Sequence, residues 1–94
     1  MNKIRAIIID DENNNIKLLQ HFLNNYCGNV EIIGTSDTVI EGIIMIKKLK
    51  PELIFLDILL GKETGFELLD KVNFNQYNVI FVTAFNEYAV KAFK

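Results

Sequence analysis

The sequence has few residues that cross-link or interrupt a fold: one cysteine, Cys27, one proline, Pro51, and no tryptophan. A single cysteine cannot form an internal disulfide, so a disulfide-stabilised secreted scaffold is excluded and a reducing cytoplasmic location is expected. We expect Cys27 to be a buried, unreactive side chain at the end of a helix. The first residues lead directly into an apolar run without the pattern of a secretory signal, which also argues against secretion.

Long apolar runs and a strong charge of either sign are also absent. No uncharged apolar run approaches the ~20 residues that cross a bilayer, so we predict no membrane association. Ten basic and twelve acidic residues give a net charge of -2. This balance provides no basic field for phosphates and argues against nucleic acid binding by this chain. With 94 residues, 50% hydrophobic and 23% charged, the chain has the composition of a single globular domain.

Short apolar runs alternate with helical patterns along the whole chain. The strand-like runs cover residues 4–9, 30–34, 53–56 and 79–82. Helices are predicted over 13–26, between Asp37 and Pro51, after a glycine-bounded loop at 61–65, and from near Asn86 to the chain end. This β-α-β-α-β-α-β-α order predicts an α/β fold with one parallel sheet and helices on both faces.

The helical spacing also predicts which apolar side chains face the sheet. These residues are, in chain order, Ile16, Leu18, Leu19, Phe22, Leu23, Tyr26, Ile40, Ile43, Ile44, Leu49, Phe66, Leu69 and Val72. Cap oxygens for the second helix are expected from Thr35, Ser36 and Asp37.

Polar residues with oxygen atoms stand where three of the four predicted strands end: Asp10 and Asp11, then Asp57, then Thr83. Because the carboxyl ends of parallel strands meet at one edge of an open sheet, we expect these side chains to share a site. Three crowded carboxylates repel one another unless a cation neutralises them, and Mg²⁺ prefers such oxygen ligands. A carboxylate can also act as a nucleophile toward phosphorus. A single such Asp could instead be a helix cap, but the whole set favours a functional site.

Three motifs at these strand ends resemble one known family. They are Ile-Ile-Ile-Asp-Asp-Glu at 7–12, Pro-Glu-Leu-Ile-Phe-Leu-Asp-Ile at 51–58 with Gly65 eight residues after the Asp, and Val-Thr-Ala at 82–84. The chain resembles the receiver domain of bacterial two-component response regulators, from Lys3 to its last residue. Residues 83–93 look more narrowly like receivers that precede LytTR-type DNA-binding domains. The resemblance implies a flavodoxin-like, doubly wound parallel sheet.

The resemblance also implies roles for individual residues. Asp57 corresponds to the phosphoacceptor, which takes a phosphoryl group from the phosphohistidine of a sensor histidine kinase. Asp10 and Asp11 correspond to the acidic pair that positions Mg²⁺. Asp57 and the Leu59 backbone carbonyl would be the other metal ligands. Thr83 corresponds to the switch hydroxyl and the Ala84 amide would bind beside it. Such a domain is not an enzyme, although it contributes groups to its own phosphorylation and dephosphorylation.

Compared with the family pattern, residues 1–94 cover a receiver of about four strands and four helices. The fifth strand, its lysine, the fifth helix and the DNA-binding output domain have no counterpart in these residues. From this difference we predict an exposed edge at the 79–82 strand. A homodimer or strand-paired oligomer could form there or through the last helix.

Three alternatives stay open from the residues alone. A non-phosphorylated interaction module is consistent with the missing lysine. A haloacid-dehalogenase-like phosphatase with Asp57 as nucleophile would need a second Asp two residues later, where Leu59 stands. A flavodoxin-like enzyme would need a phosphate-binding loop after the first strand, where Asp10, Asp11 and Glu12 would repel phosphate.

Overall fold

The computed structural model describes residues 3–60 and 62–82. Its elements, in chain order, are β1 (Ile4–Ile9), α1 (Asn13–Tyr26), β2 (Val30–Ser36), α2 (Val39–Leu49), β3 (Leu53–Asp57), β4 (Leu59–Leu60), β5 (Glu63–Thr64), α3 (Gly65–Asp70), the 3₁₀ helix η1 (Phe74–Gln76) and β6 (Asn78–Val82). The helix predicted from Asn86 lies outside the described residues. Among those residues, no helix is long and apolar enough to span a bilayer.

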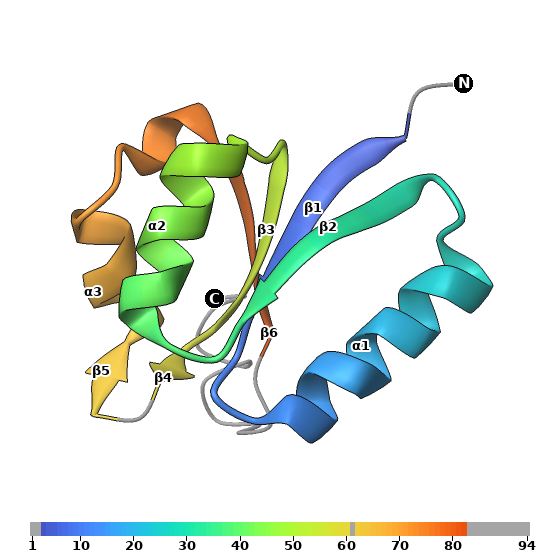
Figure 1. Cartoon of the computed structure of the whole chain (residues 1–94), viewed down its shortest axis with the longest axis horizontal. Coiled ribbons are helices and arrows are strands. Elements are labelled where there is room, and N and C mark those ends of the chain that lie inside the picture. Colours follow the sequence, from blue (N-terminus) through green and yellow to red (C-terminus); the bar gives the residue numbers. More distant parts are fainter. Residues whose placement is uncertain (1–2, 61, 83–94) are drawn as a thin grey trace, which may run out of the picture.

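The four long strands form the predicted parallel sheet, and their order is β2-β1-β3-β6 (Figure 1). Ile9 is aligned with Ser36 of β2 on one side and with Leu56 of β3 on the other, and Asp57 is aligned with Val82 of β6. The pairing of β1 with β2 shifts register between Ala6 and Ile7. Within the described part of the chain, β2 and β6 therefore form the two edges and β1 and β3 the centre.

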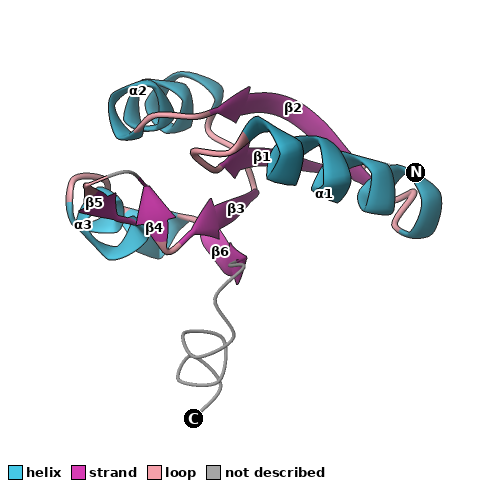
Figure 2. Cartoon of the chain, turned by 90° about the horizontal axis from the view of Figure 1, so that it is seen from below, coloured by secondary structure: helices cyan, strands magenta, loops and turns pink. Residues whose placement is uncertain are grey.

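Helices cover both faces of the sheet: α1 lies on one face, and α2 and α3 lie on the other (Figure 2). Successive residues of β1 serve opposite faces, because side chains alternate along a strand. Ile7 and Ile9 belong to the core beneath α2 and α3, whereas Ala6 and Ile8 belong to the core beneath α1. This double burial explains why residues 6–9 of β1 and 53–56 of β3 are continuous apolar runs.

The helices bury narrower stripes than the sequence predicted. On α1, Ile16 and Leu23 are buried. The prediction that Leu18, Phe22 and Tyr26 face the sheet was wrong, since these side chains are 57%, 50% and 77% exposed. A flat sheet contacts only one side of a helix, and these three residues form an i, i+4, i+8 row away from that side.

The predicted stripes of the other two helices need the same correction. On α2 the buried residues are Val39, Gly42 and Ile46, whereas Ile40 and Ile44 are exposed. On α3, Leu68 and Leu69 are buried, whereas Phe66 is exposed. The Phe66 ring packs on the ring of Phe81 in β6, with the ring centroids 4.8 Å apart. Cys27 is only half-buried, at the end of α1.

Local hydrogen bonds determine where α2 begins and ends. Its N-cap is Thr38, whose hydroxyl accepts from the Glu41 amide at 3.2 Å, instead of a residue at 35–37. Thr35 and Ser36 belong to β2, which is two residues longer than predicted. At the C-terminal end, the Arg5 guanidinium donates a hydrogen bond to the Leu49 carbonyl at 2.8 Å. This carbonyl lies in the last turn of α2, where the helix itself provides no amide donor.

The segment after β3 is not a simple loop. Strands β4 and β5 pair antiparallel, with Leu59 opposite Thr64. Thr64 then caps α3, because its hydroxyl accepts from the Glu67 amide at 3.2 Å. This small hairpin connects the end of β3 to the start of α3 at the edge of the sheet where the predicted site lies.

Candidate functional site

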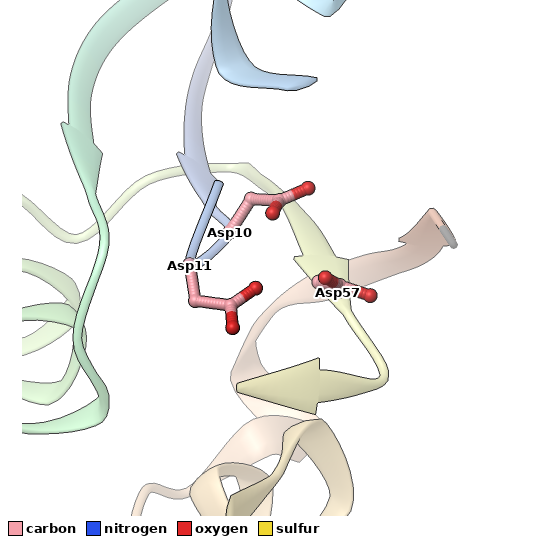
Figure 3. Close-up of side chains that lie close together, drawn as sticks. All are labelled: Asp10, Asp11 and Asp57. Atoms are coloured by element: carbon pink, nitrogen blue, oxygen red, sulfur yellow. The ribbon is translucent and has the colours of Figure 1, made fainter. Parts of the chain in front are cut away.

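The three aspartates predicted to share a site lie together at the carboxyl edge of the sheet. Asp10 follows β1, Asp57 is the last residue of β3, and these two strands are neighbours. Asp11 is the next residue along the chain. One carboxylate oxygen from each of the three lies within 4.8 Å of the others, and Figure 3 shows the side chains gathered at this edge. The parallel topology is what brings Asp10 and Asp57 together.

Backbone amides hold the two inner carboxylates. The Glu12 amide donates to Asp10 Oδ1 at 2.9 Å, and the Leu59 amide donates to Asp57 Oδ1 at 3.3 Å. Both side chains are buried, with 5% of Asp10 and 7% of Asp57 exposed, whereas Asp11 is exposed. Two anchored acids therefore form the inner side of the site and one exposed acid forms its outer side.

Burial and crowding make Asp10 and Asp57 hard to ionise in the absence of a cation. Burial is the main cause that raises the pKa of Asp57 from its ordinary value of 3.8 to about 7, and the charge of Asp10 adds to it. The hydrogen bond from Leu59 acts in the opposite direction. Burial likewise raises the pKa of Asp10, and the Glu12 amide opposes that rise. When both ionise, Asp10 and Asp57 place two negative charges close together, and a bound cation would neutralise them.

The sequence matches the response regulator receiver domain family over residues 6–94. This chain belongs to that family. The receiver domain is 36% identical over 92 residues to the transcriptional regulatory protein BtsR of Escherichia coli K12, a match that covers 97% of this chain and 38% of BtsR. It is 40% identical over 91 residues to an uncharacterized response regulatory protein of Shewanella oneidensis, covering 96% of this chain and 38% of that protein. The chain thus spans well under half the length of these curated relatives.

Solved structures with the predicted flavodoxin-like fold align with the receiver domain. A CheX–CheY complex with BeF₃ and Mg²⁺ from Borrelia burgdorferi aligns with a TM-score of 0.78 at 25% identity, over 96% of this chain and 69% of the other. The anti-anti-sigma factor PhyR of Bartonella quintana aligns with a TM-score of 0.79 at 27% identity, over 92% of this chain and 36% of the other. These alignments confirm the predicted fold class. The two enzyme alternatives, a haloacid-dehalogenase-like phosphatase and a flavodoxin-like enzyme, are not favoured.

The donor atoms of the receiver domain fit a small, hard divalent cation. All three groups are carboxylates, the ligand type that Mg²⁺ and Ca²⁺ prefer. Two of them are buried and pack side by side, an arrangement that a bound cation would stabilise by neutralising their charge. An acidic cluster of this kind can hold a metal ion and present a carboxylate oxygen beside it.

Beside the cluster, a depression of about 250 Å³ opens between the start of α2 and the β4–β5 hairpin of the receiver domain. Asp11 lines it together with Asp37 from the α2 side and Lys62 from the hairpin side. Asp37 was predicted only as a helix cap, and Lys62 was not predicted as a site residue. The strands on either side of Lys62 are two residues long, too short to leave a periodic apolar pattern in the sequence.

The other predicted site residues of the receiver domain have different outcomes. Leu59 lies at the start of the hairpin, and its amide donates a hydrogen bond to Asp57 Oδ1. Whether its carbonyl binds a cation stays a prediction. Thr83 and Ala84 lie outside the described residues, so their predicted roles also stay predictions.

The raised pKa of Asp57 predicts how the stability of the metal-free receiver domain depends on pH. The folded state keeps a proton up to about pH 7 that the unfolded chain releases near pH 4, so this group stabilises the fold most at low pH. Its contribution should be lost as pH rises from about 4 to about 7. Urea unfolding in EDTA across this range measures it. Since other groups also titrate, Asp57→Asn provides the control, and equal pH slopes for the two proteins would contradict the prediction.

Proposed function

We propose that Asp57 is the phosphoacceptor of a two-component signalling pathway and that Asp10 and Asp11 bind the Mg²⁺ that this reaction requires. The observation that carries the proposal is the cluster of three carboxylates within 4.8 Å, at the ends of β1 and β3 in a chain of the receiver family. Membership of that family supports the role. The Borrelia structure with BeF₃ and Mg²⁺ adds support, because that receiver-like relative was solved with both ions.

In the proposed reaction, one carboxylate oxygen of Asp57 attacks the phosphorus of a phosphohistidine on a sensor histidine kinase. An oxygen–phosphorus bond forms, the phosphorus–nitrogen bond breaks, and the imidazole leaves with the electron pair of that bond. The Leu59 amide fixes Asp57 Oδ1 at 3.3 Å, so the carboxylate is oriented before the donor arrives. A bound Mg²⁺ would supply positive charge for the phosphoryl oxygens as charge redistributes.

Asp10 and Asp11 serve this reaction by binding the cation rather than by attacking the donor. Asp10 is buried and held by the Glu12 amide, so it provides a fixed ligand. Asp11 is exposed at the outer side and can bind directly or through water. Thr83 and Ala84 are proposed to contact the phosphoryl oxygens, and the Leu59 carbonyl to complete the cation ligands, as the family resemblance implies.

The partners of the longer protein are part of the proposal. The relatives extend well beyond the matched region, and BtsR is named a transcriptional regulatory protein. We propose that this receiver likewise passes its signal to a DNA-binding output domain, in a protein phosphorylated by a histidine kinase. Pairing of two copies through β6 or the last helix stays a prediction.

The test is incubation of the chain with a small phosphodonor, with and without Mg²⁺, followed by intact mass measurement. We expect a phosphoryl-sized mass gain that requires Mg²⁺ and disappears with excess EDTA, because the crowded carboxylates need a cation to approach a phosphoryl anion. Mg²⁺ titration monitored by amide chemical shifts provides a separate measurement of binding. No mass gain at any Mg²⁺ concentration would contradict the proposal and favour the non-phosphorylated interaction module.

A further inference from the structure

Helix α3 begins in direct contact with the backbone of Asp57. Its first residue, Gly65, is buried. A Cβ atom at this position would lie 2.5 Å from the carbonyl oxygen of Asp57 and 3.0 Å from Leu56 Cγ. The first of these distances is shorter than folded proteins accept for a Cβ contact. Only glycine therefore allows the helix to start so close to Asp57.

Neither side of this contact can readily move away. The Gly65 amide donates to the Ile58 carbonyl at 2.7 Å, which attaches the start of α3 to the segment after Asp57. On the helix side, Leu68 is completely buried in the core. On the strand side, β3 is paired with β1 and with β6. A side chain at position 65 would thus displace either a packed helix or a central strand.

We propose that Gly65 is a positioning residue for the reaction at Asp57. Because glycine has no side chain, the start of α3 can contact the Asp57 carbonyl, and this contact determines the position of the Asp57 carboxylate relative to Asp10. The inference rests on the proposed function for its chemical consequence. Its geometric content, that Gly65 determines the position of Asp57, can be tested without any phosphoryl transfer.

Two other glycines provide matched controls. A Cβ at Gly42 of α2 would meet the side-chain end of Ile9 at 2.9 Å and that of Leu68 at 3.3 Å, so Gly42→Ala disturbs the core without touching the Asp57 backbone. A Cβ at Gly28 would meet nothing within 4 Å. The three alanine variants therefore separate a clash at Asp57, a clash in the core and no clash.

The kinetic test measures the rate of Asp57 phosphorylation by a small phosphodonor at saturating Mg²⁺, at a temperature where circular dichroism shows each variant folded. We expect Gly65→Ala to be slower by roughly 10- to 100-fold, because small misplacements of a reacting group cost rates of this order. Gly42→Ala should lower the melting temperature yet keep the rate within about twofold. Gly28→Ala should change neither. A Gly65→Ala rate equal to that of Gly42→Ala would overturn the proposal.

A second measurement uses the Leu59 amide, which donates to Asp57 Oδ1 and so reports on that carboxylate. In metal-free protein, its proton chemical shift should change in Gly65→Ala and stay constant in Gly42→Ala and Gly28→Ala. An unchanged Leu59 resonance in folded Gly65→Ala would overturn the positioning role. A wild-type chain that takes no phosphoryl group while Leu59 shifts as expected would contradict the proposed function alone.

If Gly65→Ala does not fold, a milder pair of variants decides the question. Thr64→Ala and Thr38→Ala each remove an N-cap hydroxyl that accepts a 3.2 Å hydrogen bond, at the start of α3 and of α2 respectively. Each should cost about 1 kcal/mol of stability. Only Thr64→Ala should slow phosphorylation, because it loosens the helix whose first residue, Gly65, contacts the Asp57 carbonyl. The Leu59 resonance is not used for this pair, because Leu59 lies opposite Thr64 in the hairpin. Equal phosphorylation rates of the two variants would overturn the proposal.

Discussion

Asp57→Asn is expected to abolish the phosphoryl-sized mass gain while leaving the fold intact. The asparagine amide is a poor nucleophile, so the bond from the side chain to phosphorus cannot form. The shape of the side chain is nearly unchanged, and its carbonyl oxygen can still accept from the Leu59 amide. Intact mass with a small phosphodonor and Mg²⁺ measures the loss, and circular dichroism verifies the fold.

Stability supplies a second expected effect of the same change. At pH 8 without metal, Asp57 is charged and stands beside the buried Asp10, whereas asparagine is neutral. Asp57→Asn should therefore raise the urea midpoint under these conditions. The control is Glu31→Gln, which makes the matching carboxylate-to-amide change at an exposed residue of β2 outside the cluster, and it should leave both the mass gain and the midpoint unchanged. A mass gain that persists in Asp57→Asn would show that another residue is the acceptor.

Leu68→Ala is expected to have the largest effect on stability. Leu68 is fully buried on α3, in the core that also contains Ile9 and Leu56. Removing a buried leucine side chain costs about 2 to 5 kcal/mol, through lost burial and the cavity left behind. Small domains are stable by only about 5 to 15 kcal/mol, so much of the stability should be lost. Urea unfolding measures the difference from wild type.

Leu18→Ala is the matched control for this experiment. It makes the same chemical change on a helix, but Leu18 is 57% exposed. We expect a change within about 0.5 kcal/mol. Comparable losses in the two variants would contradict the assignment of Leu68 to the core and of Leu18 to the surface.

The sheet and the acidic cluster could be predicted because each depends on a strong local pattern and a general rule of topology. A run such as Ile7 to Ile9, buried on both faces and followed at once by Asp10 and Asp11, indicates a central strand and where it ends. The rule that parallel strands end at one edge then brings Asp57 to the same place. Neither step requires knowledge of how side chains pack.

The features that could not be predicted depend on packing. Phe22 and Leu23 are both apolar, and only the position of α1 on the sheet determines that Leu23 is buried and Phe22 exposed. Strands of two residues, such as β4 and β5, are too short to carry a periodic pattern. The sequence also marks Gly65 as a turn residue without revealing that it touches the Asp57 carbonyl.

Among residues 3–60 and 62–82, the two faces of the sheet carry cores of unequal size. The core on the α1 face contains five buried residues, and the core on the face covered by α2 and α3 contains ten. Local unfolding starts where the fewest apolar contacts must be broken, so α1 should exchange its amide hydrogens faster than α3. Asp11 lies two residues before α1, whereas Asp57 ends a central strand. In the part of the chain that the structure describes, the proposed cation ligand Asp11 thus lies next to the helix with the smaller core, and the proposed acceptor Asp57 ends a strand that is paired on both sides.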